Sequence, residues 1–324
     1  MTRYVARRLA FAALLVVCVS SASFLLARLA PGDYFTQELG GTNAETIARA
    51  RARFGLDKSI GAHYRDWLAS AVRFDFGDSM LYDRPVRGLI AERAANTAVL
   101  AVTALALATA IGLPLGVFAG SRKGGLIPGA IRAASLLLLS MPPLLTSLLL
   151  VFVAARTGWF PIAGMRSASA APSGLTLDLI HHLVLPSLAI GLPLAAMLER
   201  LQAQAMSDVI GEPFVLAALA RGVPRSRVVW RDALKAALRP IAGVYGLIVG
   251  TVLSRSFAVE VISAWPGLGA LMLQALRARD VYLVAGCAAA GASFLAVGTL
   301  AADLALAFVD PRAGEDVMAN EGRA

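Results

Sequence analysis

Residues 97–119 read TAVLAVTALALATAIGLPLGVFA and contain no aspartate, glutamate, lysine or arginine. About 20 consecutive apolar residues are enough for a helix to cross the hydrocarbon core of a bilayer. The rest of the chain has the same character, since 58% of its 324 residues are hydrophobic and only 16% are charged. An ordinary soluble domain has about 45–50% apolar and about 25% charged residues. The sequence therefore predicts an all-α polytopic membrane protein.

Six uncharged or nearly uncharged runs predict six transmembrane helices: residues 9–27, 97–119, 133–155, 183–198, 241–259 and 281–302. The fourth run is short unless His181 and His182 lie at the membrane interface. The fifth contains Arg255, and three positions are open for this side chain: it faces a transport pathway, extends to the outer interface, or pairs with Glu260.

Basic residues predict the orientation of the spans. The first run follows Arg3, Arg7 and Arg8, which suits an uncleaved membrane anchor. A secretory signal peptide is the alternative, but the run is longer than a usual signal core and no clear cleavage site follows it. A cytoplasmic N-terminus places the basic loop 199–240 and the C-terminus on the same side, as the positive-inside rule expects.

The long segment before the second run predicts a small external cap, because it carries helical signals around residues 42–54 and 63–72. A mobile solvated loop is the alternative. The predicted regions are an N-terminal transmembrane helix with the cap segment (1–96), a five-helix core with the cytoplasmic loop 199–240 (97–310), and a cytoplasmic tail (311–324).

Several functional classes are excluded or disfavoured. The sequence has no G-x-x-x-x-G-K-[ST], H-E-x-x-H or G-x-S-x-G motif, so we expect no enzyme and no nucleotide-binding P-loop in this chain. Cys18 and Cys287 lie in apolar runs and indicate neither a disulfide framework nor a zinc site. The net charge of +9 is spread over loops, which indicates membrane topology rather than nucleic-acid binding. The spans lack central carboxylates, which argues against an ion-coupled secondary transporter.

The loop between the fourth and fifth runs contains EPFVLAALARG (residues 212–222), a short helix closed by glycine. Pro213 suits the first turn, Arg221 the negative end of the helix dipole, and Gly222 a left-handed stop. A second helix is expected from Pro224 to a junction at Pro240. Its expected basic face is Arg227, Arg231 and Lys235, and its expected apolar stripe is Trp230, Ala233, Leu234, Ala237 and Leu238.

Three interpretations of this loop remain open. It could be an amphipathic segment lying on anionic headgroups, or a basic loop that only satisfies topology. The third interpretation is a short exposed helix that docks a cytoplasmic partner, because its alanine-rich surface allows close approach.

At this loop the chain resembles the permease subunits of type I ABC importers. The residues that fit the pattern are Glu212, Phe214, Ala217, Ala218, Ala220, Arg221, Gly222, Val228, Leu234 and Pro240. Further motifs, in order along the chain, resemble the oligopeptide and dipeptide importer permeases. They are the N-terminal segment 1–9 with its two adjacent arginines, PGD (31–33), GLD (55–57), FGDS (76–79), LPLG (113–116), WPGLG (265–269), RD (279–280) and DPR (310–312).

The resemblance implies a subunit of the bacterial cytoplasmic (inner) membrane that forms half of a translocation pathway for peptides or peptide-like solutes. Its implied partners are a second similar permease, two cytoplasmic ATPases that bind ATP and magnesium, an external substrate-binding protein and membrane lipid, but no nucleic acid. The residues implied to dock the ATPase are Glu212, Phe214, Ala217, Ala218, Arg221 and Gly222.

The substrate is less defined than the class of transporter. Relatives of this architecture also carry nickel chelates, opines or other small solutes, and no span residue is assigned to substrate contact. The chain departs from the family pattern in the loop at Leu219, Asp232 and Ala236, and in the spans at Arg255 and Thr299. These departures concern the coupling to ATP hydrolysis and the choice of substrate rather than the fold.

Overall fold

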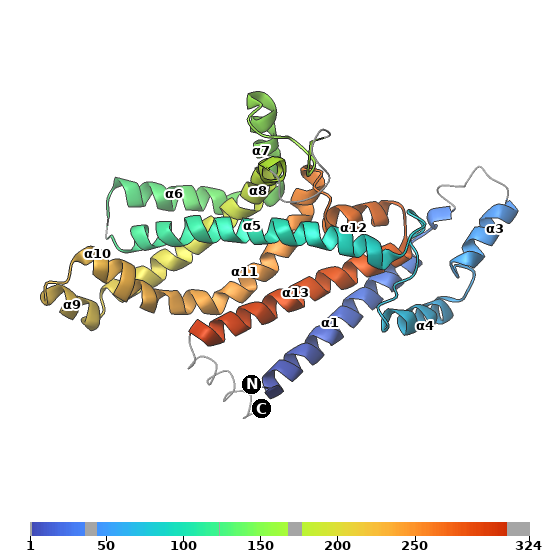
Figure 1. The fold of residues 1–324 in the computed structure, drawn as a ribbon, viewed down its shortest axis with the longest axis horizontal. Coiled ribbons are helices and arrows are strands. Elements are labelled where there is room, and N and C mark those ends of the chain that lie inside the picture. The colour runs from blue at the N-terminus through green and yellow to red at the C-terminus, as the bar shows by residue number, and fades with distance from the viewer. Residues whose placement is uncertain (1, 36–43, 123, 168–176, 310–324) are drawn as a thin grey trace. The chain divides into compact units, whose positions relative to one another are not determined.

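The computed structural model of the chain describes residues 2–35, 44–122, 124–167 and 177–309 (Figure 1). Its elements are α1 (Thr2–Leu29), α3 (Ala44–Arg53), α4 (Ile60–Ala71), α5 (Val86–Gly120), α6 (Leu126–Ser140), α7 (Pro143–Thr157), α8 (Leu177–Ile210), α9 (Pro213–Ala220), α10 (Arg225–Arg227), the π-helix η1 (Val228–Ala233), α11 (Leu234–Ile262), α12 (Leu268–Arg277) and α13 (Val281–Val309). The described residues contain no strand, only an isolated bridge between Asp78 and Pro85. The predicted all-α fold is confirmed. The predicted tail 311–324 lies outside the described residues.

Five helices of the described chain, α1, α5, α8, α11 and α13, are long and apolar enough to cross a membrane. The pair α6 and α7 passes the same test together, which gives up to six spans. Five of the six predicted runs therefore lie within single helices. Arg255, the charge in the fifth run, is partly buried within α11.

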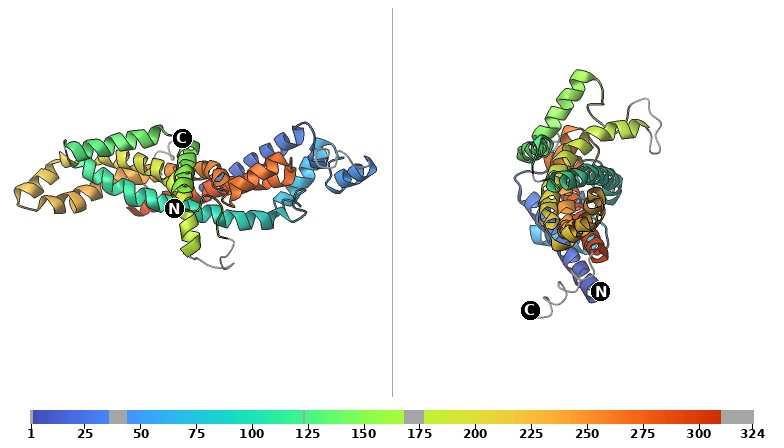
Figure 2. Two further views of the ribbon diagram at one scale, coloured as in Figure 1. Left: turned by 90° about the horizontal axis from the view of Figure 1, so that it is seen from above. Right: turned by 90° about the vertical axis from the view of Figure 1, so that its left-hand side faces the viewer.

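The predicted run 133–155 is not one straight helix, because α6 and α7 meet at an angle of 107°. Met141 and Pro142 between them are extended, with ψ of 123° and 143°. Each of these two residues precedes a proline, whose ring disfavours the helical conformation of the residue before it. Pro143 then starts α7 as its first residue. The bend, visible from two further sides in Figure 2, follows from the Pro142-Pro143 pair.

Helix α8 is longer than the predicted run 183–198 at both ends. At its start, the Nδ1 atom of His182 lies 2.8 Å from the carbonyl oxygen of Asp178, and Nε2 of His181 lies 2.8 Å from that of Trp159. At its end, Glu199 and Met206 are buried. The first residues of the predicted cytoplasmic loop 199–240 therefore continue the membrane helix, because they pack against neighbouring helices.

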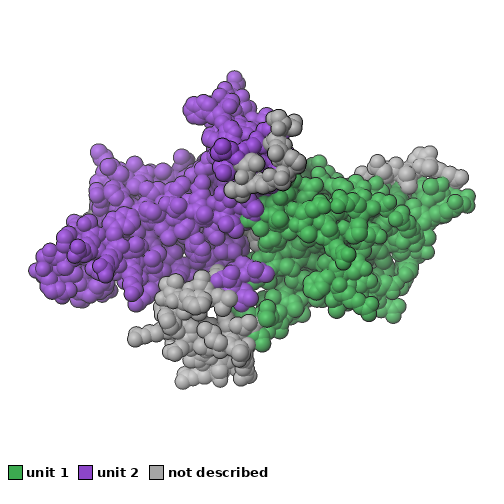
Figure 3. Space-filling view, in the orientation of Figure 1, with its two compact units in different colours: residues 1–98, 266–296 green, residues 99–265, 297–324 purple. Residues whose placement is uncertain are grey.

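The chain divides into two compact units, shown in green and purple in Figure 3. The first comprises residues 1–98 and 266–296, and the second residues 99–265 and 297–324. Packing thus groups α12 and most of α13 with the N-terminal region.

An aromatic cluster fixes α4 to α1 in the first unit. The Phe24 ring stacks on Trp67 with 4.6 Å between centroids and meets His63 edge-on at 5.0 Å. The Tyr64 hydroxyl donates a hydrogen bond of 2.9 Å to Ser21. Helices α3 and α4 coincide with the two helical signals of the predicted cap, whose external position stays a prediction.

The buried carboxylate of Asp280 joins the FGDS segment to the start of α13. One of its oxygens accepts hydrogen bonds from the Ser79 hydroxyl at 2.6 Å and the Leu81 amide at 3.1 Å. The other accepts from the Leu283 amide at 3.0 Å and so caps α13. Two of the short motifs read from the sequence, FGDS and RD, therefore meet at one structural joint.

His63 is held in its neutral form by its surroundings. The Tyr282 hydroxyl donates to the carbonyl oxygen of Phe54 at 2.9 Å, so it accepts from His63 Nε2, which lies 2.8 Å away. Nδ1 of His63 is buried without a hydrogen-bond partner among the described residues. Burial lowers the pKa of His63, and the positive charges of Arg28 and Lys58 lower it further.

In the second unit, α5 and α8 approach closely through glycines spaced four residues apart. A Cβ atom at Gly112 would lie 2.5 Å from the Ala195 carbonyl oxygen, and one at Gly120 would lie 2.3 Å from that of Ala203. At Gly116 it would lie 2.6 Å from Cβ of Gln202. Only glycine allows this contact, because real Cβ atoms do not approach other atoms so closely.

We expect Gly116→Ala to destabilise the protein by about 1–3 kcal/mol, because the added methyl group forces α5 and α8 apart. Gly88→Ala in the same helix is the matched control, since a Cβ atom there has nothing within 4 Å. Alanine also has the higher helix propensity, so the control should keep or slightly raise stability. Thermal unfolding of both variants in detergent measures the difference, and equal melting temperatures would contradict the close helix contact.

We expect the melting temperature of the purified chain to fall between pH 7.5 and pH 5.5. Because the pKa of His63 is lower in the folded state than its ordinary value of 6.5, the unfolded chain takes up the proton first. The stabilising effect of neutral His63 is complete above about pH 6.5 and is lost as the pH falls below it. His63→Gln should show a smaller change over the same interval. An equal change in both proteins would assign the pH dependence to other groups.

Candidate functional site

The short helix α9 begins with the features predicted from the sequence. Pro213 occupies its first position, where the missing amide proton costs nothing. The carbonyl oxygen of Glu212 accepts from the amides of Val215 at 3.0 Å and Leu216 at 3.2 Å, which starts the helix. The Glu212 side chain makes no capping hydrogen bond and remains exposed.

The end of α9 is a Schellman motif centred on Gly222. This residue has φ of +80°, and its amide donates to the Leu219 carbonyl at 2.9 Å. The Val223 amide donates to the Ala218 carbonyl at 3.2 Å. These two bonds satisfy carbonyl groups that the helix end leaves free, and the left-handed conformation favours glycine. The predicted glycine stop is confirmed.

Val215 and Ala218 of α9 are buried. They pack the helix against the rest of the second unit. They belong to a cluster that also contains Val117 from α5, Met206 from α8, and Val228, Val229, Ala233 and Ala237 from the following segment. The helix therefore rests on the ends of three longer helices.

The predicted docking residues occupy different positions around α9. Glu212 and Gly222 are exposed at its two ends. Phe214, which is 46% exposed, lies with Ala217 and Arg221 on one exposed face, as their spacing of three and four residues requires. Ala218 differs, since only 6% of its surface is exposed. It supports the helix from below, and a docked partner would not touch it.

The second helix of the loop differs from the prediction. It does not end at Pro240, which lies inside α11. Val228 and Val229 are buried, whereas Trp230, expected in the apolar stripe, is 50% exposed. The cause is η1, whose wider turns shift the phase of the side chains that the spacing of an ordinary α-helix predicts. Arg227, Arg231 and Lys235 are exposed as predicted, and Ala233 and Ala237 are buried.

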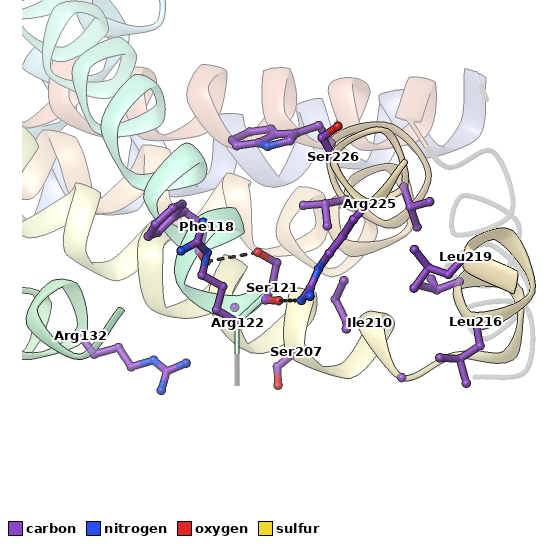
Figure 4. Close-up of a pocket in the computed structure, with 16 residues that line it drawn as sticks. Phe118, Ser121, Arg122, Arg132, Ser207, Ile210, Leu216, Leu219, Arg225 and Ser226 are labelled. Carbon is purple, nitrogen blue, oxygen red and sulfur yellow. Dashed lines mark hydrogen bonds between the residues drawn. The ribbon is translucent and has the colours of Figure 1, made fainter. Parts of the chain in front are cut away.

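A groove of about 1530 Å³ lies between α9, α10, η1 and the adjoining ends of α5 and α8 (Figure 4). Its lining comprises Phe118, Gly120, Ser121, Arg122, Arg132, Ser207, Ile210, Gly211, Val215, Leu216, Leu219, Arg225, Ser226, Val228, Val229 and Trp230. Three arginines and no acidic residue are among the described residues that line it.

Two of the groove arginines cap the carbonyl end of α5. Arg225 donates to the Ser121 carbonyl at 3.0 Å, and Arg132 donates to the Ala119 carbonyl at 3.0 Å. Arg122 instead lies over the Phe118 ring, 4.1 Å from its centroid. Sequence reasoning missed this group, because the three arginines come from separate segments. The last turn of a helix leaves carbonyl groups without partners in the helix. This would have indicated that donors such as Arg225 and Arg132 come to the end of α5.

The region combines an exposed short helix with basic side chains that line a groove. The described residues contain no group of three histidine, cysteine, aspartate or glutamate side chains that could hold a metal ion. What the region offers is a protruding helix with an exposed face and a cationic groove beside it. Helices α1, α5, α8, α11 and α13 of the same chain are long and apolar enough to cross a membrane, so the fold is that of a polytopic membrane protein.

Comparison with known proteins gives the family. Residues 112–315 match the family described as binding-protein-dependent transport system inner membrane component. Residues 1–101 match the family of the N-terminal part, binding-protein-dependent transport system membrane component, N-term. The chain belongs to this family of inner membrane transport components, and the family indicated by its sequence motifs is confirmed.

Similar proteins align over nearly the whole chain. A protein named putative peptide permease from Brucella suis is 31% identical, over 96% of this chain and 99% of its own length. The oligopeptide transport system permease protein AppB of Bacillus subtilis is 30% identical over 96% of this chain and 99% of its own. The dipeptide transport system permease protein DppB of Escherichia coli is 29% identical over 96% and 98%.

Ala217 and Ala218 are a matched pair that tests how α9 is seated. We expect Ala218→Leu to speed amide hydrogen exchange in residues 213–223 by roughly tenfold, because the larger side chain does not fit the buried contact. Ala217→Leu, on the exposed face, should leave the exchange unchanged. Mass spectrometry of the exchanged peptides provides the measurement. Similar protection in both variants would show that α9 does not rest on Ala218.

Proposed function

We propose that the chain is a permease subunit of an ATP-driven ABC importer and forms half of a translocation pathway for peptides or peptide-like solutes. The observation that carries this proposal is the match, over at least 96% of the chain, to relatives named for the transport of peptides, oligopeptides and dipeptides. The permease is a transport component and works with other subunits.

The docking element of the proposed permease is the exposed face of α9, formed by Phe214, Ala217 and Arg221. Its small and apolar residues allow a partner surface to approach, and Arg221 adds a charge for selectivity. The alanine-rich surface of α9 carries no side chains suited to catalysis, so its proposed role is mechanical. Because α9 follows α8 after two residues and is seated on the start of α11, a push on α9 moves both spans.

We propose three kinds of protein partner. Two cytoplasmic ATPases bind ATP and magnesium and dock on α9 and on its counterpart in a second, similar permease. An external binding protein delivers the solute. The chain has no P-loop, so the energy of transport comes from the ATPases.

The proposed orientation places both termini, α9 and the groove in the cytoplasm. The support is the excess of basic residues in the N-terminal segment and in loop 199–240. The segment with α3 and α4 then lies outside, where a binding protein arrives.

We expect Arg221→Glu and Gly222→Val to insert normally in the membrane but to lose the ATPases on co-purification and to lose peptide uptake. The first reverses the charge on the docking face, which costs about 2–5 kcal/mol where a paired charge is buried by the partner. The second places a branched residue at a φ of +80° and distorts the end of α9. Pull-down of the ATPases and uptake of labelled peptide measure both effects.

Arg231→Glu is the matched control for Arg221→Glu. Arg231 is an exposed basic residue of the same loop, but it belongs to η1 rather than to α9. It should retain the ATPases. Full retention of the ATPases by both α9 variants would overturn the docking assignment, and solute transport by the purified chain alone, driven by an ion gradient, would overturn the importer.

A further inference from the structure

The groove and the docking face lie on opposite sides of α9. Successive residues of an α-helix are about 100° apart, so Phe214, Ala217 and Arg221 share one side. Leu216 and Leu219, which line the groove, point to the other side, and Val215 and Ala218 point into the core between them. An ATPase docked on the first face would therefore not fill the groove.

The groove is suited to a negatively charged group. Its three arginines each carry five N–H donors, and the hydrogen bonds of Arg132 and Arg225 to backbone carbonyls leave most of these donors available. Arg122 is exposed and held over Phe118, so its guanidinium is oriented without being neutralised. Planar guanidinium groups bind phosphate oxygens through paired hydrogen bonds.

The surroundings of the groove are apolar and lie where spans end. The groove adjoins the last turn of α5 and the end of α8. Leu136 and Leu139, four and seven residues after the groove residue Arg132 in α6, are 54% and 37% exposed on the same side of that helix. Trp230 lines the groove while half of its surface remains open. Aromatic and basic residues at the end of a span are typical of the headgroup layer of a bilayer.

We propose that this groove binds the phosphate of an anionic phospholipid. Arg122, Arg132 and Arg225 hold the headgroup, while the acyl chains lie along the exposed leucines that follow Arg132 in α6, Leu136 and Leu139. The charges and the apolar surface beside them favour an amphiphile over a free anion, and the position behind α9 favours lipid over the ATPase. The inference goes beyond the proposed function, since neither the docking of ATPases nor the transport of peptides implies a lipid site.

The bound phosphate would join segments that are far apart in the sequence. Arg122 follows α5, Arg132 belongs to α6 and Arg225 to α10, and the groove is walled by Leu216 and Leu219 of α9. A lipid in this position would therefore steady the surface on which α9 is seated. Transport coupling would then depend on the anionic lipid content of the membrane.

The test is lipid binding by the full-length chain in detergent, measured by native mass spectrometry with phosphatidylglycerol and phosphatidylcholine. We expect the wild-type chain to bind phosphatidylglycerol more tightly. Arg122→Gln should weaken this binding about fivefold, the effect of one basic residue near a charged membrane surface. It leaves the two carbonyl caps of α5 intact, so folding is preserved. Arg122→Lys should restore most of the affinity.

Arg231→Gln is the control, because Arg231 is exposed in the same segment but does not line the groove. It should bind phosphatidylglycerol as the wild type does. Equal affinity in Arg122→Gln and wild type, an equal loss in Arg231→Gln, or displacement of the lipid by millimolar inorganic phosphate would overturn the proposal. Co-purification of the ATPases separates the two assignments. Loss of the ATPases in Arg122→Gln with unchanged lipid binding would assign the groove to the ATPase instead.

Discussion

The close contact between α5 and α8 is the constraint on which the end of the second unit that carries α9 depends. Gly112, Gly116 and Gly120 let the backbones meet, which leaves no room for side chains between the two helices. The contact continues to the last turn of α5, where Val117 and Met206 form part of the seat of α9. The position of α9 is thus set by backbone packing rather than by flexible side chains.

This packing leaves polar side chains of α8 buried in the second unit. Both carboxylate oxygens of Glu199 and the amide of Gln202 have no hydrogen-bond partner among the described residues. Buried polar groups without hydrogen bonds are costly in an apolar interior. Apolar neighbours cannot offset this cost, so Glu199 and Gln202 lower the stability of the contact between α5 and α8. The extension of α8 beyond the predicted run therefore has two effects. It contributes Met206 to the contact with α9, and it buries the polar side chains of Glu199 and Gln202 without hydrogen bonds to the described part of the chain.

Sequence reasoning predicted the parts of this fold that depend on local chemistry. Uncharged runs predicted spans within five single helices, and Pro213 and Gly222 predicted both ends of α9, because these residues act through their own backbone. The sequence predicted a short exposed helix here, but not which of its faces is buried. The burial of Ala218 was missed, since an alanine fits a surface and a core equally well. The groove arginines were missed because their meeting depends on the tertiary structure.

The π-helix η1 has a consequence for how such a subunit can change over generations. One additional residue in a helical turn rotates all that precedes it by about 100° about the helix axis. A single-codon deletion within Val228–Ala233 would therefore change the direction in which α10 and the chain before it leave α11, while the residues after Leu234 kept their helical phase. The segment that carries α9 and the long helix α11 can thus change separately over generations.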